Sequence, residues 1–220
     1  MINLEPFNQT KLFGLNNYIQ NLIYLDKKKI LPNKILLSGQ KGLGKSTLAY
    51  HFINYSLSKN EKFPYNQEDF FINDKNHSYK TILNKSNLNF HLIDIDLEKK
   101  SIDLDQIRKL ITSLNKSSFN NKPRFVLIDN IEFLNVNSIN ALLKILEEPT
   151  LDVYFILINN NKRILQTLTS RCLNFKISLT NQQCLSISEK LLNKKIDDVI
   201  NKDLISYYST PGNIYKLIKF

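Results

Sequence analysis

The stretch Gly39-Gln40-Lys41-Gly42-Leu43-Gly44-Lys45-Ser46 holds three of the chain's five glycines and matches the pattern G-x-x-x-x-G-K-[ST] at every fixed position. The apolar run Ile35-Leu36-Leu37 precedes it, and a helical spacing of Leu48, Phe52 and Tyr55 follows it. A strand, a glycine-rich turn and a helix start together present a nest of backbone N–H groups that can hold phosphate. The stretch therefore predicts a nucleotide pocket in an α/β fold.

Each residue type in this loop suits one task. The glycines let the backbone turn and come close to the phosphates. Lys45 is expected to place its ammonium group on the β- and γ-phosphates, and Ser46 to ligate Mg²⁺ through its hydroxyl. A glycine-rich turn with a solvated lysine is the alternative, and the strand–loop–helix context argues against it. The nucleotide-binding residues predicted in this loop are Gly39, Gly42, Gly44, Lys45, Ser46 and Thr47.

Length and charge bound the class of protein. A chain of 220 residues can bury a core and hold one α/β domain with a small appendage. Its 30 Lys and Arg against 20 Asp and Glu give a net charge of +10, which is compatible with nucleic-acid binding. The alternative is that Lys, Asn and Ile dominate because of an AT-rich genome, and both interpretations stay open.

The two cysteines, Cys172 and Cys184, form no C-x-x-C or Cys/His cluster, so zinc is not expected. Two cysteines beside a nucleotide loop favour a reducing cytoplasm. Residues 1–10 are polar and lack an apolar signal core, and no apolar stretch reaches membrane-spanning length. The sequence therefore predicts a cytoplasmic protein without a membrane partner.

Apolar runs alternate with helical patterns, which predicts a parallel sheet covered by helices on both faces. The predicted strands are residues 35–38, 90–93, 125–128, 154–158 and 173–177. The predicted helices are residues 15–25, residues 45–57, a helix capped by Asp103 that bears Leu104 to Leu114, and a helix bearing Ile139 to Leu146 that stops before Pro149.

Two further segments complete this prediction. Residues 58–88 are polar and are expected to form surface loop and short helix. After Leu179 only a helical pattern remains, in Leu185, Leu191, Ile196, Ile200 and Leu204. We therefore expect a nucleotide-binding domain over residues 1–179 and a small helical domain over residues 180–220.

Asp129 ends the apolar strand of residues 125–128, where a carboxylate can hold Mg²⁺ through its water shell. Hydrolysis also needs a group that orients and deprotonates the attacking water. Asn130 comes next, and its amide can position a water but cannot take its proton. Glu132 is a candidate base, but the favoured interpretation is that it only suits the positive N-terminal end of the next helix. The pattern predicts nucleotide binding with weak or absent hydrolysis.

Two further motifs resemble those of the AAA+ clamp-loader family. Residues 140–149 read N-A-L-L-K-I-L-E-E-P and closely resemble that family's N-A-L-L-K-x-L-E-E-P signature. Ser170-Arg171-Cys172 resembles its S-R-C motif, and Leu12-Phe13-Gly14 resembles its opening motif, whose following helix lies near the adenine. The resemblance covers residues 10–217. It implies a P-loop NTPase with a RecA-like AAA+ domain and a three-helix lid, assembled in a five-subunit arc.

Three features resemble the delta-prime branch of this family in bacterial DNA polymerase III. Asp129-Asn130-Ile131-Glu132 departs from the D-E-A-[DH] run of the motor subunits, in which a glutamate directly follows the aspartate. The zinc-binding cysteine cluster of the gamma/tau type is missing. Residues 102–114 resemble the I-D-x-I-R-x-L helix common to these proteins.

The resemblance assigns Arg171 a role as an arginine finger that acts in trans on a neighbour's ATP. Such a finger is worth roughly 10³–10⁵ in rate in comparable systems. The alternative is a surface arginine paired with a nearby carboxylate. Asn159 or Asn160 occupies the position of the family's sensor 1 residue. Because three asparagines follow one another, the sequence does not decide which of them is sensor 1, and they could equally be a turn signal. Asn159 is the residue assigned to nucleotide binding.

Two departures bear on independent activity. Residues 209–213 stand where the lid helix of active relatives begins, and the nearest cation after them is Lys216 rather than a sensor 2 arginine. Family members continue into a helical collar domain, whereas this sequence reaches Phe220 soon after the lid. We therefore expect either that the collar was removed or lost, or that another polypeptide supplies it.

The resemblance thus implies a clamp-loader subunit that supports ATP-dependent sliding-clamp loading in DNA replication and that binds ATP and Mg²⁺. Its implied partners are the other loader subunits, the sliding clamp, and primer–template DNA through its phosphates. The alternative is a self-sufficient AAA+ ATPase that remodels DNA or protein, with Glu132 as base. A sequence-specific DNA binder is a third interpretation, and no helix-turn-helix pattern supports it.

Overall fold

The structure, a computed structural model, describes residues 4–96, 99–116, 120–148, 152–201, 205 and 209–219. Its centre is a parallel sheet made of β1 (Lys34–Ser38), β2 (Phe90–Ile93), β3 (Arg124–Ile128), β4 (Val153–Asn159) and β5 (Leu173–Lys176). The five strands run in the order β2-β3-β4-β1-β5. Each predicted strand is confirmed to within one residue at either end.

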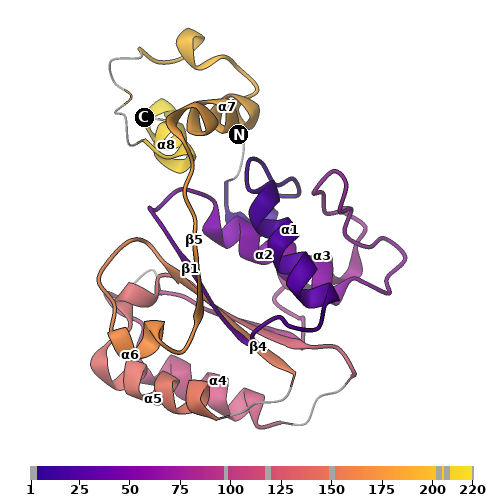
Figure 1. The fold of residues 1–220 in the computed structure, drawn as a ribbon, viewed down its shortest axis with the longest axis vertical. Helices are drawn as coiled ribbons and strands as arrows, with labels where there is room; N and C mark the ends of the chain where they lie inside the picture. The colour runs from indigo at the N-terminus through magenta and orange to yellow at the C-terminus, as the bar shows by residue number, and fades with distance from the viewer. Residues whose placement is uncertain are drawn as a thin grey trace.

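Helices cover both faces of this sheet, as predicted from its uniformly apolar strands (Figure 1). One face carries α1 (Asn16–Lys27), α2 (Lys45–Leu57) and α3 (His77–Leu83). The other carries α4 (Leu104–Leu114) and α5 (Val136–Glu147). Short helices at Pro6–Asn8 (η1), Ile131–Phe133 (η2) and Gln166–Thr169 (α6) were not predicted. Pro149, the predicted stop of α5, lies outside the described residues.

Alternate side chains of β1, β3 and β4 enter two separate cores. In β3, Phe125 and Leu127 join the core beneath α2, where Phe125 meets the ring of Phe52 edge-on. Val126 and Ile128 enter the opposite core with Leu142 of α5. All these side chains are buried. Removing apolar surface from water stabilises the fold by about 25 cal/mol per Å².

Residues 58–88 contain the predicted short helix, α3, but the prediction that the segment lies on the surface is wrong for several of its side chains. Tyr65 and Ile72 are buried in the core beside α2. Asn76 is fully buried because its side chain caps α3 at Tyr79 N and also bonds the amide of Asn54. Paired asparagines satisfy each other's hydrogen bonds, so a polar composition did not mean exposure here.

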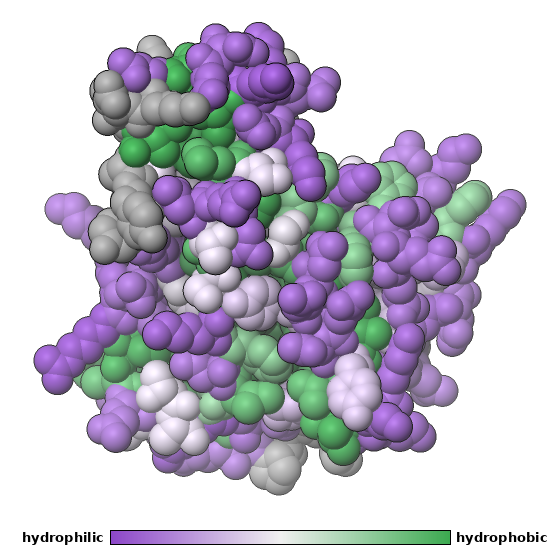
Figure 2. All heavy atoms as spheres, turned by 45° about the horizontal axis from the view of Figure 1, so that its top comes forward, coloured by the Kyte–Doolittle hydropathy of each residue, from purple (hydrophilic) through white to green (hydrophobic). Residues whose placement is uncertain are grey.

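The C-terminal part is helical, with α7 (Asn181–Leu192), a short η3 (Ile196–Asp198) and α8 (Pro211–Lys219). Thr180 and Gln183 form a capping box that begins α7. Figure 2 shows this part as a lobe on the α/β part, with hydrophilic side chains over much of its outer surface. Leu204 lies outside the described residues. Across the described part of the chain, no helix is both long and apolar enough to cross a membrane.

His51 of α2 is a buried histidine that ties two segments together. Its Nε2 donates to the carbonyl of Gln9 and its Nδ1 accepts from the hydroxyl of Tyr65, each at 3.0 Å. Burial lowers the pKa of His51 to about 4, although the bond to Gln9 opposes the shift. The neutral ring is therefore the folded form near neutral pH.

We expect the free energy of unfolding to fall as pH drops from about 6.5 towards 4. In that window the unfolded chain takes up a proton on His51 and the folded chain does not. The loss is about 3 kcal/mol over the whole window. Denaturant unfolding between pH 5 and 7 checks it. His51→Gln should reduce the dependence of the unfolding free energy on pH. His77→Gln, at an exposed histidine of α3, should leave that dependence unchanged. The same pH dependence in His51→Gln as in the parent chain would contradict the assignment.

Candidate nucleotide site

The glycine loop joins β1 to α2 at the carboxyl end of the sheet. Gly42 and Gly44 adopt φ angles of +89° and +87°, a region that residues with side chains rarely enter. Gly39 donates its N–H to the carbonyl of Asn159 at 3.3 Å, which ties the loop to β4. The loop therefore has the tight turn that its glycines predict.

Lys45 and Ser46 lie at the start of α2. Lys45 is 3% exposed, and its Nζ donates to the carbonyls of Gly39 at 2.9 Å and Gln40 at 2.6 Å. Burial lowers the pKa of Lys45 to about 8, although the nearby charge of Asp129 acts in the opposite direction. Ser46 Oγ donates to Asp129 Oδ2 at 2.5 Å, so the two predicted magnesium residues are in contact.

Asp129 follows β3 and is mostly buried. Burial raises the pKa of this carboxyl, and the hydrogen bond from Ser46 opposes the rise. The loop thus places an ammonium group, a hydroxyl and a carboxylate together in a poorly solvated position. Burying charges in this way is costly unless opposite charges compensate them. These three groups fit a phosphate chain with a magnesium ion. The phosphate would supply negative charge beside Lys45, and the magnesium ion would supply positive charge beside Asp129.

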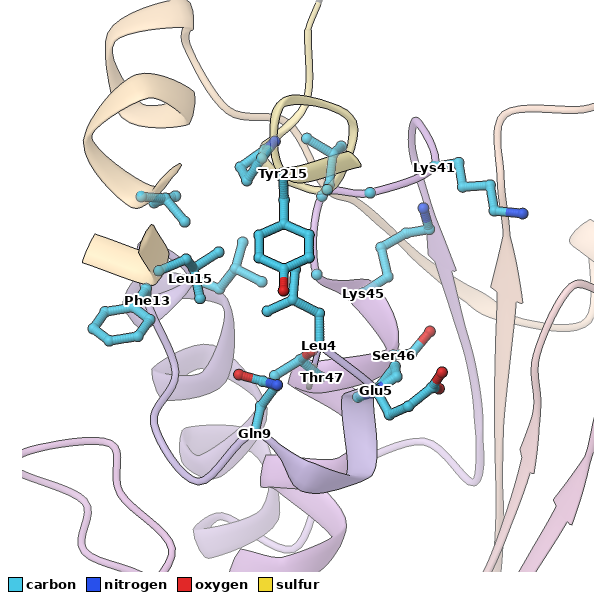
Figure 3. Close-up of a pocket in the computed structure, with 18 of the residues that line it drawn as sticks. Leu4, Glu5, Gln9, Phe13, Leu15, Lys41, Lys45, Ser46, Thr47 and Tyr215 are labelled. Carbon is cyan, nitrogen blue, oxygen red and sulfur yellow. The ribbon is translucent and has the colours of Figure 1, made fainter. Parts of the chain in front are cut away.

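A cavity of about 680 Å³ opens over this loop, within the range of small-molecule sites. Figure 3 shows Lys45, Ser46 and Thr47 at its rim and Tyr215 pointing into it from α8. Its apolar lining includes Phe13, Leu15, Ile187, Leu191 and Tyr215. Because the polar loop and the apolar wall adjoin, the cavity fits a ligand with a charged and a planar part.

A chain of side-chain hydrogen bonds crosses the ends of β2, β3 and β4. Asn130 donates through Nδ2 to Asp94 Oδ1 at 2.7 Å and accepts from Asn160 Nδ2 at 2.8 Å. Asn160 Nδ2 also donates to Glu132 Oε1 at 3.0 Å, and its backbone N–H donates to Oε2 at 3.3 Å. Glu132 is therefore bound to Asn160 and does not line the cavity.

Asp94 is a cavity-lining carboxylate that sequence reasoning missed. It follows β2 in the way that Asp129 follows β3, and the carboxyl ends of parallel strands meet at one edge of the sheet. An aspartate directly after a predicted strand was therefore the sequence signal that could have identified Asp94. The one-residue spacing after each strand brings both carboxylates to the same cavity.

The two candidates for sensor 1 differ in direction. The side chain of Asn159 turns back to Lys162, donating to its carbonyl at 2.9 Å and accepting from its N–H at 3.1 Å. Asn160 lines the cavity, and Asn159 does not. The structure thus brings Asn160, rather than the assigned Asn159, to the other predicted residues.

Arg171 lies apart from this cavity, just after α6. One guanidinium nitrogen donates to the carbonyl of Thr167 at 2.6 Å, and the other donates to Glu147 Oε1 at 2.5 Å. Its side chain is 34% exposed and that of Glu147 is 53% exposed. Arg171 is therefore held near the surface, and no bond of its own to the glycine loop appears among the described residues.

The start of α8 touches the glycine loop directly. A Cβ built at Gly212 would lie 2.8 Å from Gly42 Cα, and one at Gly42 would lie 2.4 Å from Thr210 Oγ1. Two glycines thus face each other where the helical lobe meets the loop. Sequence reasoning missed this contact, because the two segments are about 170 residues apart.

The parallel sheet, the glycine loop and Asp129 define a P-loop NTPase fold. Solved structures of Thermotoga maritima proteins share the fold. A DNA polymerase III gamma subunit-related protein matches at 20% identity over 80% of this chain and 55% of its own, with a TM-score of 0.52. The RuvB Holliday junction branch migration motor matches at 19% identity over 98% of this chain and 65% of its own, with a TM-score of 0.55.

The family model described as "DNA polymerase III, delta subunit" matches residues 14–181, and the chain belongs to this family. A DNA polymerase III subunit delta' of Buchnera aphidicola subsp. Schizaphis graminum is 28% identical over 83% of this chain and 53% of the relative. A DNA polymerase III subunit gamma of Buchnera aphidicola subsp. Acyrthosiphon pisum is 32% identical over 67% of this chain. The chain spans 53% and 39% of the lengths of these two relatives.

We expect Gly212→Ala to lower the free energy of unfolding by about 1 kcal/mol. The added methyl group would press on Gly42 backbone, and overpacking of this kind costs about 1–3 kcal/mol, more than the helix propensity gained. Denaturant unfolding measures it. Asn213→Ala, at the exposed next residue, gains propensity without the clash and should not destabilise. A more stable Gly212→Ala protein would show that the contact is not tight.

Proposed function

We propose that this chain is a delta-prime-type subunit of a DNA polymerase III clamp loader and supports ATP-dependent loading of the sliding clamp in DNA replication. Membership of the delta subunit family supports the proposal, as do relatives named delta' and gamma subunits. Its partners would be other loader subunits, the sliding clamp, and primer–template DNA contacted through phosphates. The net charge of +10 agrees with the last of these.

The chain would bind ATP with Mg²⁺ and hydrolyse it poorly. Lys45 would bind the phosphates, Ser46 would ligate the ion, and Asp129 would hold its water shell. Bound there, the ion would neutralise charge on the phosphate oxygens. The other proposed nucleotide contacts are Gly39, Gly42, Gly44, Thr47 and, at the end of β4, Asn159 or its neighbour Asn160.

The observation that carries weak hydrolysis is the position of Glu132. Its carboxylate accepts two hydrogen bonds from Asn160 and lies outside the cavity lining. Asn130 directly follows Asp129 and bonds Asp94, and an amide cannot accept a proton from water. The loop is therefore complete for binding, while Glu132 is bonded to Asn160 outside the cavity lining and Asp94, the second carboxylate in that lining, accepts a hydrogen bond from Asn130.

The helical residues 180–220 would act as the lid of a nucleotide-binding domain formed by residues 1–179. The capping box at Thr180 supports a boundary here, because it begins α7 directly after the last strand region. The contact of Gly212 with Gly42 supports a lid seated on the phosphate loop.

Arg171 would act in trans, in the ATP site of a neighbouring subunit. Its place outside the chain's own cavity supports this role. The ion pair with Glu147 is no obstacle, because exposed ion pairs are worth only about 0–1 kcal/mol. A triphosphate on the neighbour carries more charge than one carboxylate and would replace it.

A self-sufficient AAA+ ATPase that remodels DNA or protein is the second candidate. The intact loop and the Ser46–Asp129 contact favour it. It requires Glu132 to leave Asn160 and act as base.

In a loader reconstituted with its partner subunits, we expect Arg171→Ala to slow hydrolysis at the adjacent ATP site by about 10³-fold or more and to impair clamp loading. Arg171→Lys should not restore the rate, because an ammonium group lacks the planar fork of the guanidinium. Arg163→Ala, at an exposed arginine on the neighbouring loop, is the matched control and should leave hydrolysis unchanged. Size-exclusion chromatography should show the same assembly for all variants. Unchanged hydrolysis and clamp loading in Arg171→Ala would remove the proposal.

A further inference from the structure

Two carbonyl groups of the phosphate loop face the lid. The hydroxyl of Thr210 donates to the carbonyl of Lys41 at 2.8 Å, across 169 positions of the sequence. The backbone N–H of Gly212 donates to the carbonyl of Gly42 at 3.0 Å. Thr210 is 1% exposed, so its hydroxyl is shielded from water and its bond to Lys41 lacks competition from solvent.

The direction of these carbonyls fixes the direction of the N–H groups that follow them. A trans peptide is planar, and its C=O and N–H bonds point to opposite sides. With the Lys41 carbonyl held towards Thr210, the N–H of Gly42 points away from Thr210. In the same way, the Gly42 carbonyl held by Gly212 turns the N–H of Leu43 away from the lid. Both residues line the cavity.

Among the described residues, the hydrogen bonds to the Lys41 and Gly42 carbonyls come from the lid alone. Gly42 has no side chain and a φ of +89°. Glycine adopts positive and negative φ angles about equally readily, so the residue itself does not hold this conformation. A loop whose N–H groups become ordered only when the ligand binds has a lower affinity, because the ordering costs free energy. The hydrogen bonds from the lid therefore supply an orientation that the glycines alone leave open.

We propose that Thr210 is a positioning residue for phosphate binding. Its hydroxyl holds the Lys41 peptide so that the N–H groups of Gly42 and Leu43 are aimed at the phosphates of the nucleotide. Thr210 itself does not line the cavity and acts through the loop. The inference rests on the proposed binding of ATP. It adds that Thr210, which lies outside the cavity lining, orients the phosphate loop in a chain that has no arginine at the start of its lid helix.

Thr210 also begins α8, and this second role must be separated from the first. Its hydroxyl accepts from Asn213 N at 3.4 Å, and its carbonyl accepts from Ile214 N at 2.9 Å. Thr180 offers a matched control, because its hydroxyl caps α7 by accepting from Gln183 N. The Thr180 side chain accepts its hydrogen bond within its own capping box.

Isothermal titration of the full 220-residue chain with Mg²⁺ and either ATP or inorganic tripolyphosphate tests the proposal. We expect Thr210→Val to raise the Kd for both ligands about tenfold, the cost of roughly one well-placed hydrogen bond. Thr210→Ser keeps the hydroxyl and should stay within about twofold of the parent chain. Thr180→Val should lower the free energy of unfolding by about 1 kcal/mol and leave both Kd values unchanged.

Several results would overturn the proposal. An unchanged Kd in Thr210→Val would do so, and so would an equal weakening in Thr180→Val, since the effect would then run through lid stability. Hydrogen exchange of the parent chain gives a check that needs no variant: tripolyphosphate should slow exchange at the amides of Gly42 and Leu43, and unprotected amides would contradict the geometry. A parent chain that binds neither ligand would contradict the proposed nucleotide binding itself, and the inference with it.

Discussion

The turn between β1 and α2 is the constraint on which the rest of the site depends. Gly42 and Gly44 take backbone angles that only glycine adopts readily, and this brings Lys45 and Ser46 to the start of α2 beneath the cavity. Every other feature of the site is arranged around that turn. β3 supplies Asp129 to Ser46, β4 accepts the N–H of Gly39, and the lid closes on Gly42. A sheet with parallel neighbours on both sides of β1 holds these elements at one edge.

The site combines a complete binding loop with a diverted hydrolytic centre. Lys45 and Asp129 are buried charges whose compensation by a phosphate and a magnesium ion would be favourable. Glu132, in contrast, is bound by Asn160, and Asn130 by both Asp94 and Asn160. Arg171 is oriented elsewhere, between α6 and the end of α5. The proposed nucleotide-binding residues and Arg171, the proposed trans-acting arginine, thus lie apart within one chain.

Local patterns in the sequence predicted the elements that local forces determine. The apolar runs gave β1 to β5, and the glycine spacing with the apolar residues after it gave α2. Asp103 caps α4 as expected, together with Gln106. Long-range contacts were beyond such patterns: the asparagine pair Asn54–Asn76 buries a segment that reads as surface. The direction of three consecutive asparagines and the contact between Gly42 and Gly212 likewise depend on tertiary packing.

We expect the isolated chain to bind ATP and hydrolyse it poorly, and analysis of its bound nucleotide tests both properties together. The purified chain is loaded with radiolabelled ATP and Mg²⁺, freed of unbound nucleotide, incubated for an hour, and its bound nucleotide is then analysed. We expect about one equivalent of nucleotide per chain, recovered as ATP, with release of phosphate far below the rate of roughly 1 per second that marks the slow end of ordinary enzymes. Recovery of ADP with continuing turnover, or of no nucleotide at all, would contradict it.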